Sequence, residues 1–180
     1  MDKTASESTV IMTELVLPND TNTFGNLMGG RLMYWMDIAA ALAGAKHCNV
    51  PVVTASVDNI SFTSPIKLGN VVHIEAKVSR TFNSSMEVHM KVWGEDALQQ
   101  YKYKSNEAYY TFVSLDPNGK PRPVPGLVPE TDDEKKLFDS GYRCMVKSSL
   151  KVEQTTMFQG NHLLARKAQP SERTECGGTR

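Results

Sequence analysis

One acidic side chain lies in the middle of an otherwise apolar segment of the 180-residue sequence. Asp37 has Met33, Met36, Ile38 and Ala41 as its neighbours at positions i−4, i−1, i+1 and i+4. Carboxylates are seldom buried without a partner or a function. Two interpretations stay open from these residues. Asp37 faces a solvent slot or pairs with a lysine, or it takes part in a reaction as a base or nucleophile.

A glycine pair comes directly before the predicted helix that carries Asp37. Gly29 and Gly30 stand where unpaired backbone N–H groups and the positive end of a helix dipole point outward. Such groups can polarise a carbonyl oxygen, although a glycine pair can also be a simple tight turn. Asp37 follows Gly30 by seven residues, about 10.5 Å along a helix. If both serve one reaction, two antiparallel copies of the helix must share the site, which predicts a homodimer.

One long helix and several strands must position these groups. Residues 31–47 contain no proline and are apolar on nearly all sides, which predicts a buried helix. Alternation in 71–80 and 86–93, joined by a turn at 83–85, predicts an antiparallel sheet with one face in water. Further strands are predicted at 9–17, 52–63 and 107–115. The fold class is α+β, with a sheet of about five strands wrapped around one central helix.

After the predicted sheet, the sequence contains a proline-rich segment and then a short helical pattern. Residues 117–129 hold five of the nine prolines and are predicted to form an extended strap. The sequence from Thr131 to Glu134 is a capping-box pattern, which predicts a short helix ending near Ser140. We therefore divide the chain into a core domain at 1–128, a helical extension at 129–150 and a flexible tail at 151–180.

Composition excludes several classes of protein. The chain has 20 basic and 20 acidic side chains, 40% hydrophobic residues and 22% charged residues, which is typical of a globular domain. Zero net charge argues against nucleic acid as the main partner and weakly favours self-association. Cys48, Cys144 and Cys176 form no CxxC, so we expect neither a disulfide framework nor a metal site. Without a signal peptide or an apolar run of ~20 residues, we predict no membrane span and a cytoplasmic protein.

Several motifs resemble those of acyl-CoA thioesterases with the hotdog fold. They are Asn-Asp-Thr-Asn at 19–22, Gly-Asn-Leu-Met-Gly-Gly at 25–30, Met-Asp at 36–37, and the segments 62–72 and 116–125. The resemblance covers roughly residues 9–128. It implies a five-stranded sheet around the helix, a dimer as the catalytic unit and often a trimer of dimers.

The resemblance also assigns roles to the residues around the active helix. Asp37 matches the catalytic acid of the family, and Asn26 matches a position that helps to hold water and substrate. Gly29 and Gly30 match the donors that polarise the thioester carbonyl.

For the CoA phosphates, the resemblance points to the turn from Arg80 to Ser85, which includes Ser84. Lys67 or Lys120 could serve instead.

These residues together predict hydrolysis of acyl-CoA to a carboxylic acid and free CoA. No cofactor is required, because CoA is part of the substrate. Asp37 would deprotonate a water held with Asn26, or attack directly to form a mixed anhydride, and the sequence leaves both routes open. One alternative is a regulatory hotdog protein that binds acyl-CoA without catalysis. The presence of both Asn26 and Asp37 argues against it, because a protein that only binds acyl-CoA needs no acid there. A hotdog hydratase or dehydratase would need a histidine near the active helix, and His47 lies at its far end.

Overall fold

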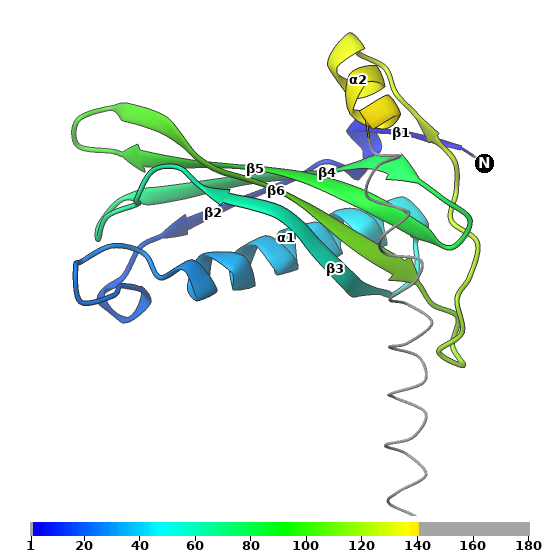
Figure 1. Ribbon diagram of the computed structural model, residues 1–180, viewed down its shortest axis with the longest axis horizontal. Coiled ribbons are helices and arrows are strands. Elements are labelled where there is room, and N and C mark those ends of the chain that lie inside the picture. The colour runs from blue at the N-terminus through cyan, green and yellow to red at the C-terminus, as the bar shows by residue number, and fades with distance from the viewer. Residues whose placement is uncertain (1, 141–180) are drawn as a thin grey trace, which may run out of the picture.

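The computed structural model describes residues 2–140, in which a large sheet packs against a long helix (Figure 1). The helix, α1, spans Gly29–Cys48. The sheet has five strands in the order β2-β4-β5-β6-β3, and every neighbouring pair is antiparallel. The strands are β2 (Val10–Leu15), β3 (Val52–Phe62), β4 (Val71–Thr81), β5 (Ser85–Asp96) and β6 (Tyr101–Ser114). The predicted α+β class, with a five-stranded antiparallel sheet on a single long helix, is confirmed.

The strand bounds differ from the prediction mainly at β6. This strand begins at Tyr101, six residues before the predicted start at 107. Its first residues pair with the last residues of β5, beginning with Tyr101 opposite Asp96. A second sheet was not predicted. It consists of two parallel residue pairs, between β1 (Lys3–Thr4) and β7 (Leu127–Val128), and it fixes the end of the proline-rich strap against the N-terminal segment.

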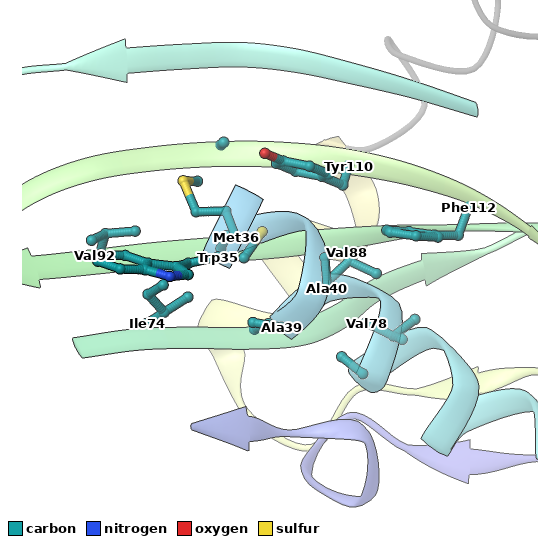
Figure 2. Close-up of a cluster of buried hydrophobic side chains, with 14 of the residues drawn as sticks. Trp35, Met36, Ala39, Ala40, Ile74, Val78, Val88, Val92, Tyr110 and Phe112 are labelled. Carbon is teal, nitrogen blue, oxygen red and sulfur yellow. The ribbon is translucent and has the colours of Figure 1, made fainter. Parts of the chain in front are cut away.

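Helix α1 packs its small residues toward the sheet. Ala39, Ala40 and Ala43 are fully buried, and their short side chains let the helix approach the strands closely. Figure 2 shows Trp35 and Met36 of α1 among side chains that come from three strands of the sheet. The labelled strand residues are Ile74 and Val78 of β4, Val88 and Val92 of β5, and Tyr110 and Phe112 of β6.

The opposite face of α1 is exposed in this chain. Met33, Tyr34 and Leu42 are 36%, 56% and 53% exposed. The prediction that the apolar helix is buried all round is therefore wrong for the single chain. The sheet curves over only one side of the helix, so the apolar residues of the other side have nothing in this chain to pack against (Figure 1).

The face of the sheet that points away from α1 is less exposed to solvent than predicted. The inward residues of 71–80 and 86–93 are buried as expected, but the outward residues Glu87 and His89 are each only 2% exposed. Glu87 accepts a hydrogen bond from the hydroxyl of Ser79 at 2.8 Å. His89 lies 2.6 Å from Glu107 and stacks on Tyr109, with ring centroids 4.8 Å apart. The centre of this face is therefore a hydrogen-bonded polar layer, built by neighbours from three strands.

The short helix α2, Asp132–Ser140, lies on the side of the sheet opposite α1 (Figure 1). The predicted capping box is confirmed. Thr131 Oγ1 accepts the N–H of Glu134 at 3.2 Å, and Glu134 Oε2 accepts the N–H of Thr131 at 3.0 Å. Glu134 also pairs with Lys77 of β4 at 3.0 Å, which attaches α2 to the sheet. Residues 141–150 of the predicted extension and the predicted tail at 151–180 lie outside the described residues.

Candidate active site

The chain between β2 and α1 folds back on itself before the helix begins. Thr21 and Leu27 form an antiparallel bridge, and the N–H of Asn22 donates to the carbonyl of Asn26 at 2.8 Å. Gly25 takes a positive φ of 71° at the turn, a conformation that glycine adopts without strain. This small hairpin is attached to residues 66–68 by two further backbone hydrogen bonds. It therefore holds Asn22 and Asn26 at the N-terminal end of α1.

A cleft of about 290 Å³ opens at this end of the helix. It is lined by the hairpin, the start of α1, the end of β3 with residues 63–66 that follow it, and the first half of β6. The lining residues include Asn22, Asn26, Gly29, Leu32, Phe62 and Asn106. Two of the predicted site residues, Asn26 and Gly29, are therefore brought together. Gly30 is not among the residues that line the cleft.

The glycine pair forms the first turn of α1 itself, two residues earlier than predicted. The residue before the helix, Met28, provides no side-chain cap. Within residues 2–140, the N–H groups of Gly29 and Gly30 have no hydrogen-bond partner. A Cβ on Gly29 would lie 3.4 Å from the ring of Phe62, which also lines the cleft, so a residue without a side chain fits this position. An unpaired N–H at a residue that lines the cleft can polarise a carbonyl oxygen bound there.

Asp37 lies half-buried on α1, on the side that faces β3. Its Oδ1 accepts a hydrogen bond from the hydroxyl of Thr54 at 2.8 Å. No lysine pairs with Asp37 in the described part of the chain, so the lysine pair is not supported. The side chain is only half-buried, which leaves the interpretation as a carboxylate that faces solvent open for the single chain. Burial, assisted by the charge of Asp37, raises the pKa of Tyr110 to about 12, so this tyrosine stays protonated at neutral pH.

The single chain does not assemble the whole predicted site. Asp37 is not among the residues that line the cleft, and it follows Gly29 by about 12 Å along the helix axis at 1.5 Å per residue. Thr54 was missed at the sequence level. It was visible only as a polar residue in a predicted strand, and its contact with Asp37 joins positions 17 residues apart.

The predicted CoA contacts are divided between the two ends of α1. The backbones of Lys67 and Asn26 form an isolated antiparallel β-bridge near the N-terminal end of α1. Ser84 and Ser85 lie near the C-terminal end, where the carbonyl of Ser84 accepts the N–H of Ser114 at 3.0 Å. Ser114 in turn pairs with Val52 at the start of β3.

Arg80 is already engaged with α2. Its guanidinium donates to the carbonyl of Phe138 and lies over the rings of Phe82 and Phe138, with the cation 5.6 and 4.9 Å from their centroids. Lys120 lies in the strap, where its backbone exchanges hydrogen bonds with Asp116.

The described histidines lie away from the cleft. His47 is buried at the end of α1 and bonds the carbonyl of Pro125 at 3.0 Å, while His73 pairs with Glu95 at 2.5 Å. Burial lowers the pKa of His47 and raises the pKa of the buried Cys48 thiol. Within residues 2–140, no group of three or more His, Cys, Asp or Glu side chains could hold a metal ion. No helix in this range is long and apolar enough to cross a bilayer.

This fold and this cleft define a hotdog-type domain, and comparison with known proteins gives its family. Residues 24–99 match the thioesterase superfamily. The chain is 42% identical to the uncharacterized acyl-CoA thioester hydrolase YkhA of Bacillus subtilis over 134 residues, which are 74% of this chain and 78% of that protein. It is also 42% identical to the cytosolic acyl coenzyme A thioester hydrolase of Mus musculus. That match covers 77% of this chain but only 37% of the mouse protein.

Solved structures agree with the sequence comparison. A hexameric acyl-CoA thioesterase superposes with a TM-score of 0.80 at 35% identity, over 84% of this chain and 97% of that one. An acyl-CoA hydrolase of Staphylococcus aureus, solved with butyryl coenzyme A and coenzyme A, gives 0.78 at 36% identity, over 90% and 99%. The chain belongs to the thioesterase superfamily, and the predicted kinship with hotdog-fold acyl-CoA thioesterases is confirmed.

Proposed function

We propose that this protein hydrolyses acyl-CoA thioesters to a carboxylic acid and CoA. The observation that carries the proposal is the start of α1, where Gly29, whose N–H has no hydrogen-bond partner within residues 2–140, lines a cleft together with three asparagines. These donors stabilise the negative charge that develops on the thioester oxygen during attack. The names of the relatives in Bacillus subtilis and mouse support the same activity.

The catalytic unit of the proposal is a dimer. The exposed apolar face of α1 is continuous with the edge strand β3, whose Val53 and Val57 are 45% and 36% exposed. Within the described residues, β3 pairs with β6 alone, so its other edge is free to meet a second copy. An antiparallel arrangement brings Asp37 of one copy toward the Gly29 end of the other. The hexameric neighbour supports further assembly into a trimer of such dimers.

In this arrangement, Asp37 serves as base or as nucleophile. As a base, it takes a proton from water while the oxygen attacks the carbonyl carbon, and the C–S bond then breaks to release the CoA thiolate. As a nucleophile, it forms a mixed anhydride that water later hydrolyses. Thr54 holds the carboxylate by its 2.8 Å hydrogen bond and leaves Oδ2 without a partner in residues 2–140.

Asn22 is a better candidate than Asn26 for the polar residue that binds water or substrate. Solved variants of the Staphylococcus aureus hydrolase replace an aspartate, a threonine 17 residues after it and an asparagine 15 residues before it. Here Thr54 follows Asp37 by 17 residues, and Asn22, not Asn26, precedes it by 15. The Oδ1 of Asn22 accepts two backbone N–H groups, which leaves its amide N–H₂ to donate into the cleft.

The same two-copy arrangement explains the divided CoA contacts. Ser84 and Ser85 of one copy, near the C-terminal end of α1, would lie toward Lys67 of the other. We propose that these groups, rather than the engaged Arg80, meet the CoA phosphates. Because the substrate carries the CoA leaving group and Asp37 acts on water or on the thioester, no separate cofactor is needed. The cytosolic mouse relative supports a cytoplasmic location.

The test is release of CoA thiol from acyl-CoA substrates of increasing chain length. We expect release by the wild-type protein and at least a 100-fold lower rate in Asp37→Asn. A matched control is Asp58→Asn, because Asp58 also accepts a side-chain hydroxyl, from Ser56 at 2.9 Å, but lies on β3 rather than on α1. Binding of acyl-CoA without thiol release would favour the regulatory alternative.

A further inference from the structure

Asp20 connects the chain before α1 to the first turn of the helix. Its side chain is buried, with Oδ1 accepting from Nε of Arg31 at 2.6 Å and Oδ2 accepting the N–H of Leu17 at 3.1 Å. Its main-chain carbonyl accepts the N–H of Met28 at 2.9 Å, directly before the helix. One buried aspartate therefore fixes both ends of the hairpin that carries Asn22.

The Arg31 side chain is itself held by neighbouring residues of α1. Its guanidinium carbon lies 5.8 Å from the ring centroids of both Tyr34 and Trp35, and Trp35 is anchored in the core. Burial opposes ionisation of Asp20, but the hydrogen bonds from Arg31 and Leu17 outweigh it and lower the pKa of this carboxyl. Asp20 is therefore charged at neutral pH, and the pair forms a charge-assisted link between loop and helix.

The groups enclosed by this link must be placed accurately for catalysis. The N–H of Gly29 and the amide of Asn22 lie on the short stretch of chain between Asp20 and Arg31. Donors aimed at a developing oxyanion lose much of their effect when displaced by about 1 Å. Neither Asp20 nor Arg31 lines the cleft, so neither is expected to touch the substrate.

We propose that Asp20 and Arg31 are positioning residues, which hold the carbonyl-binding end of α1 in its active geometry. This inference rests on the proposed thioesterase function. It differs from a general structural role in one respect. A structural role alone would lower stability without changing the kcat of the folded fraction, whereas positioning lowers kcat and leaves KM nearly unchanged.

The experiment compares kcat and KM for acyl-CoA hydrolysis in Asp20→Ala, Asp20→Asn and Arg31→Gln. We expect kcat to fall roughly 10- to 100-fold in Asp20→Ala and about 3- to 10-fold in Arg31→Gln, with KM within about twofold of wild type. Asp20→Asn should recover part of the loss, because the amide oxygen can still accept one of the two bonds. Hydrogen exchange of the amides in 21–30 should quicken in the same order.

Glu134 provides a matched control. Like Asp20, it is a buried carboxylate that accepts backbone N–H groups and pairs with a cation, Lys77 at 3.0 Å, but it belongs to α2. Glu134→Ala should lose stability while its folded fraction keeps the wild-type kcat.

The outcomes separate the two proposals. Absence of thiol release by the wild type from any acyl-CoA would overturn the proposed function. Wild-type turnover with unchanged kcat in Asp20→Ala and Arg31→Gln would overturn only the positioning role, as would an equal loss of kcat in Glu134→Ala. If Asp20→Ala fails to fold, Arg31→Gln decides the question, because the Arg31 side chain is 41% exposed and its replacement leaves the core intact.

Discussion

Helix α1 has apolar side chains on two faces, but only one of these faces is buried by other residues of the chain. The face toward the sheet buries Met36, Ala39 and Ala40 completely. The other face leaves Tyr34 and Leu42 more than half exposed and carries the half-buried Asp37. This difference in surroundings is the basis of our proposal that a second copy of the chain covers the exposed face, which is also the face that carries Asp37.

The largest expected effect on activity comes from placing a charge on the exposed apolar face of α1. Leu42→Arg places a charge where we propose that two copies meet, so the dimer should dissociate and hydrolysis should fall at least 100-fold. Sedimentation or light scattering reports the mass, and thiol release reports the activity. Leu98→Arg is the matched control, because Leu98 is 98% exposed in the β5–β6 turn. A fully active Leu42→Arg dimer would show that this face is not the contact.

Truncation on the buried face should act on stability instead. Met36 is 0% exposed and packs among strand residues (Figure 2), so Met36→Ala should lower the free energy of unfolding by about 2–5 kcal/mol. Urea unfolding measures the change. The remaining folded protein should keep its oligomeric state, and a loss of mass without a loss of stability would reverse the roles of the two faces.

A smaller effect is expected where β3 meets the exposed face. Thr54→Val removes the hydrogen bond to Asp37 and preserves the shape of the side chain. The carboxylate then loses its fixed orientation, so kcat should fall about tenfold, equivalent to ~1.4 kcal/mol, with the dimer intact. Steady-state kinetics with Thr54→Ser as the control checks this, since serine restores the donor. Equal rates in Thr54→Val and wild type would remove Thr54 from the mechanism.

A pH dependence of stability, absent at neutral pH, is expected at the junction between helix and sheet. The pKa of Tyr110 is raised to about 12 in the folded chain from an ordinary value of 10, so its ionisation favours unfolding. The stability is complete below pH 10 and declines as pH rises toward 12, by at most about 1.4 kcal/mol per pH unit. Denaturant midpoints across this range should decline less steeply in Tyr110→Phe. Parallel declines would assign the effect to another group.

Local patterns in the sequence predicted much of this fold. Alternation gave the strands around Ile74 and Val88, and the spacing from Thr131 to Glu134 gave the capping box. The β1–β7 pair was not predictable, because two-residue strands carry no periodicity. Burial of His89 was also missed, since it depends on Glu107 and Tyr109 from the next strand rather than on its own strand.

The candidate site, like the fold, has some residues that the sequence predicted and others that it did not. The glycine pair and Asp37 were recognisable from residue type and spacing, because an acid in an apolar helix is unusual wherever the helix packs. Thr54 and the Asp20–Arg31 link were not, since each depends on a contact between separate elements. Whether Asn22 or Asn26 serves the reaction was decided neither by composition nor by periodicity, as both line the cleft.

The central claim is that Asp37 of one copy serves the Gly29 end of another. Mixed dimers of Asp37→Ala with Gly29→Pro test it most directly, because proline is tolerated at the first helical position yet lacks the N–H donor. Each variant alone should be inactive. A shared site predicts that the mixed dimer regains one intact site and so up to about half of the wild-type activity. Mixed dimers that form and stay inactive would contradict the claim, because every site would then depend on a single chain.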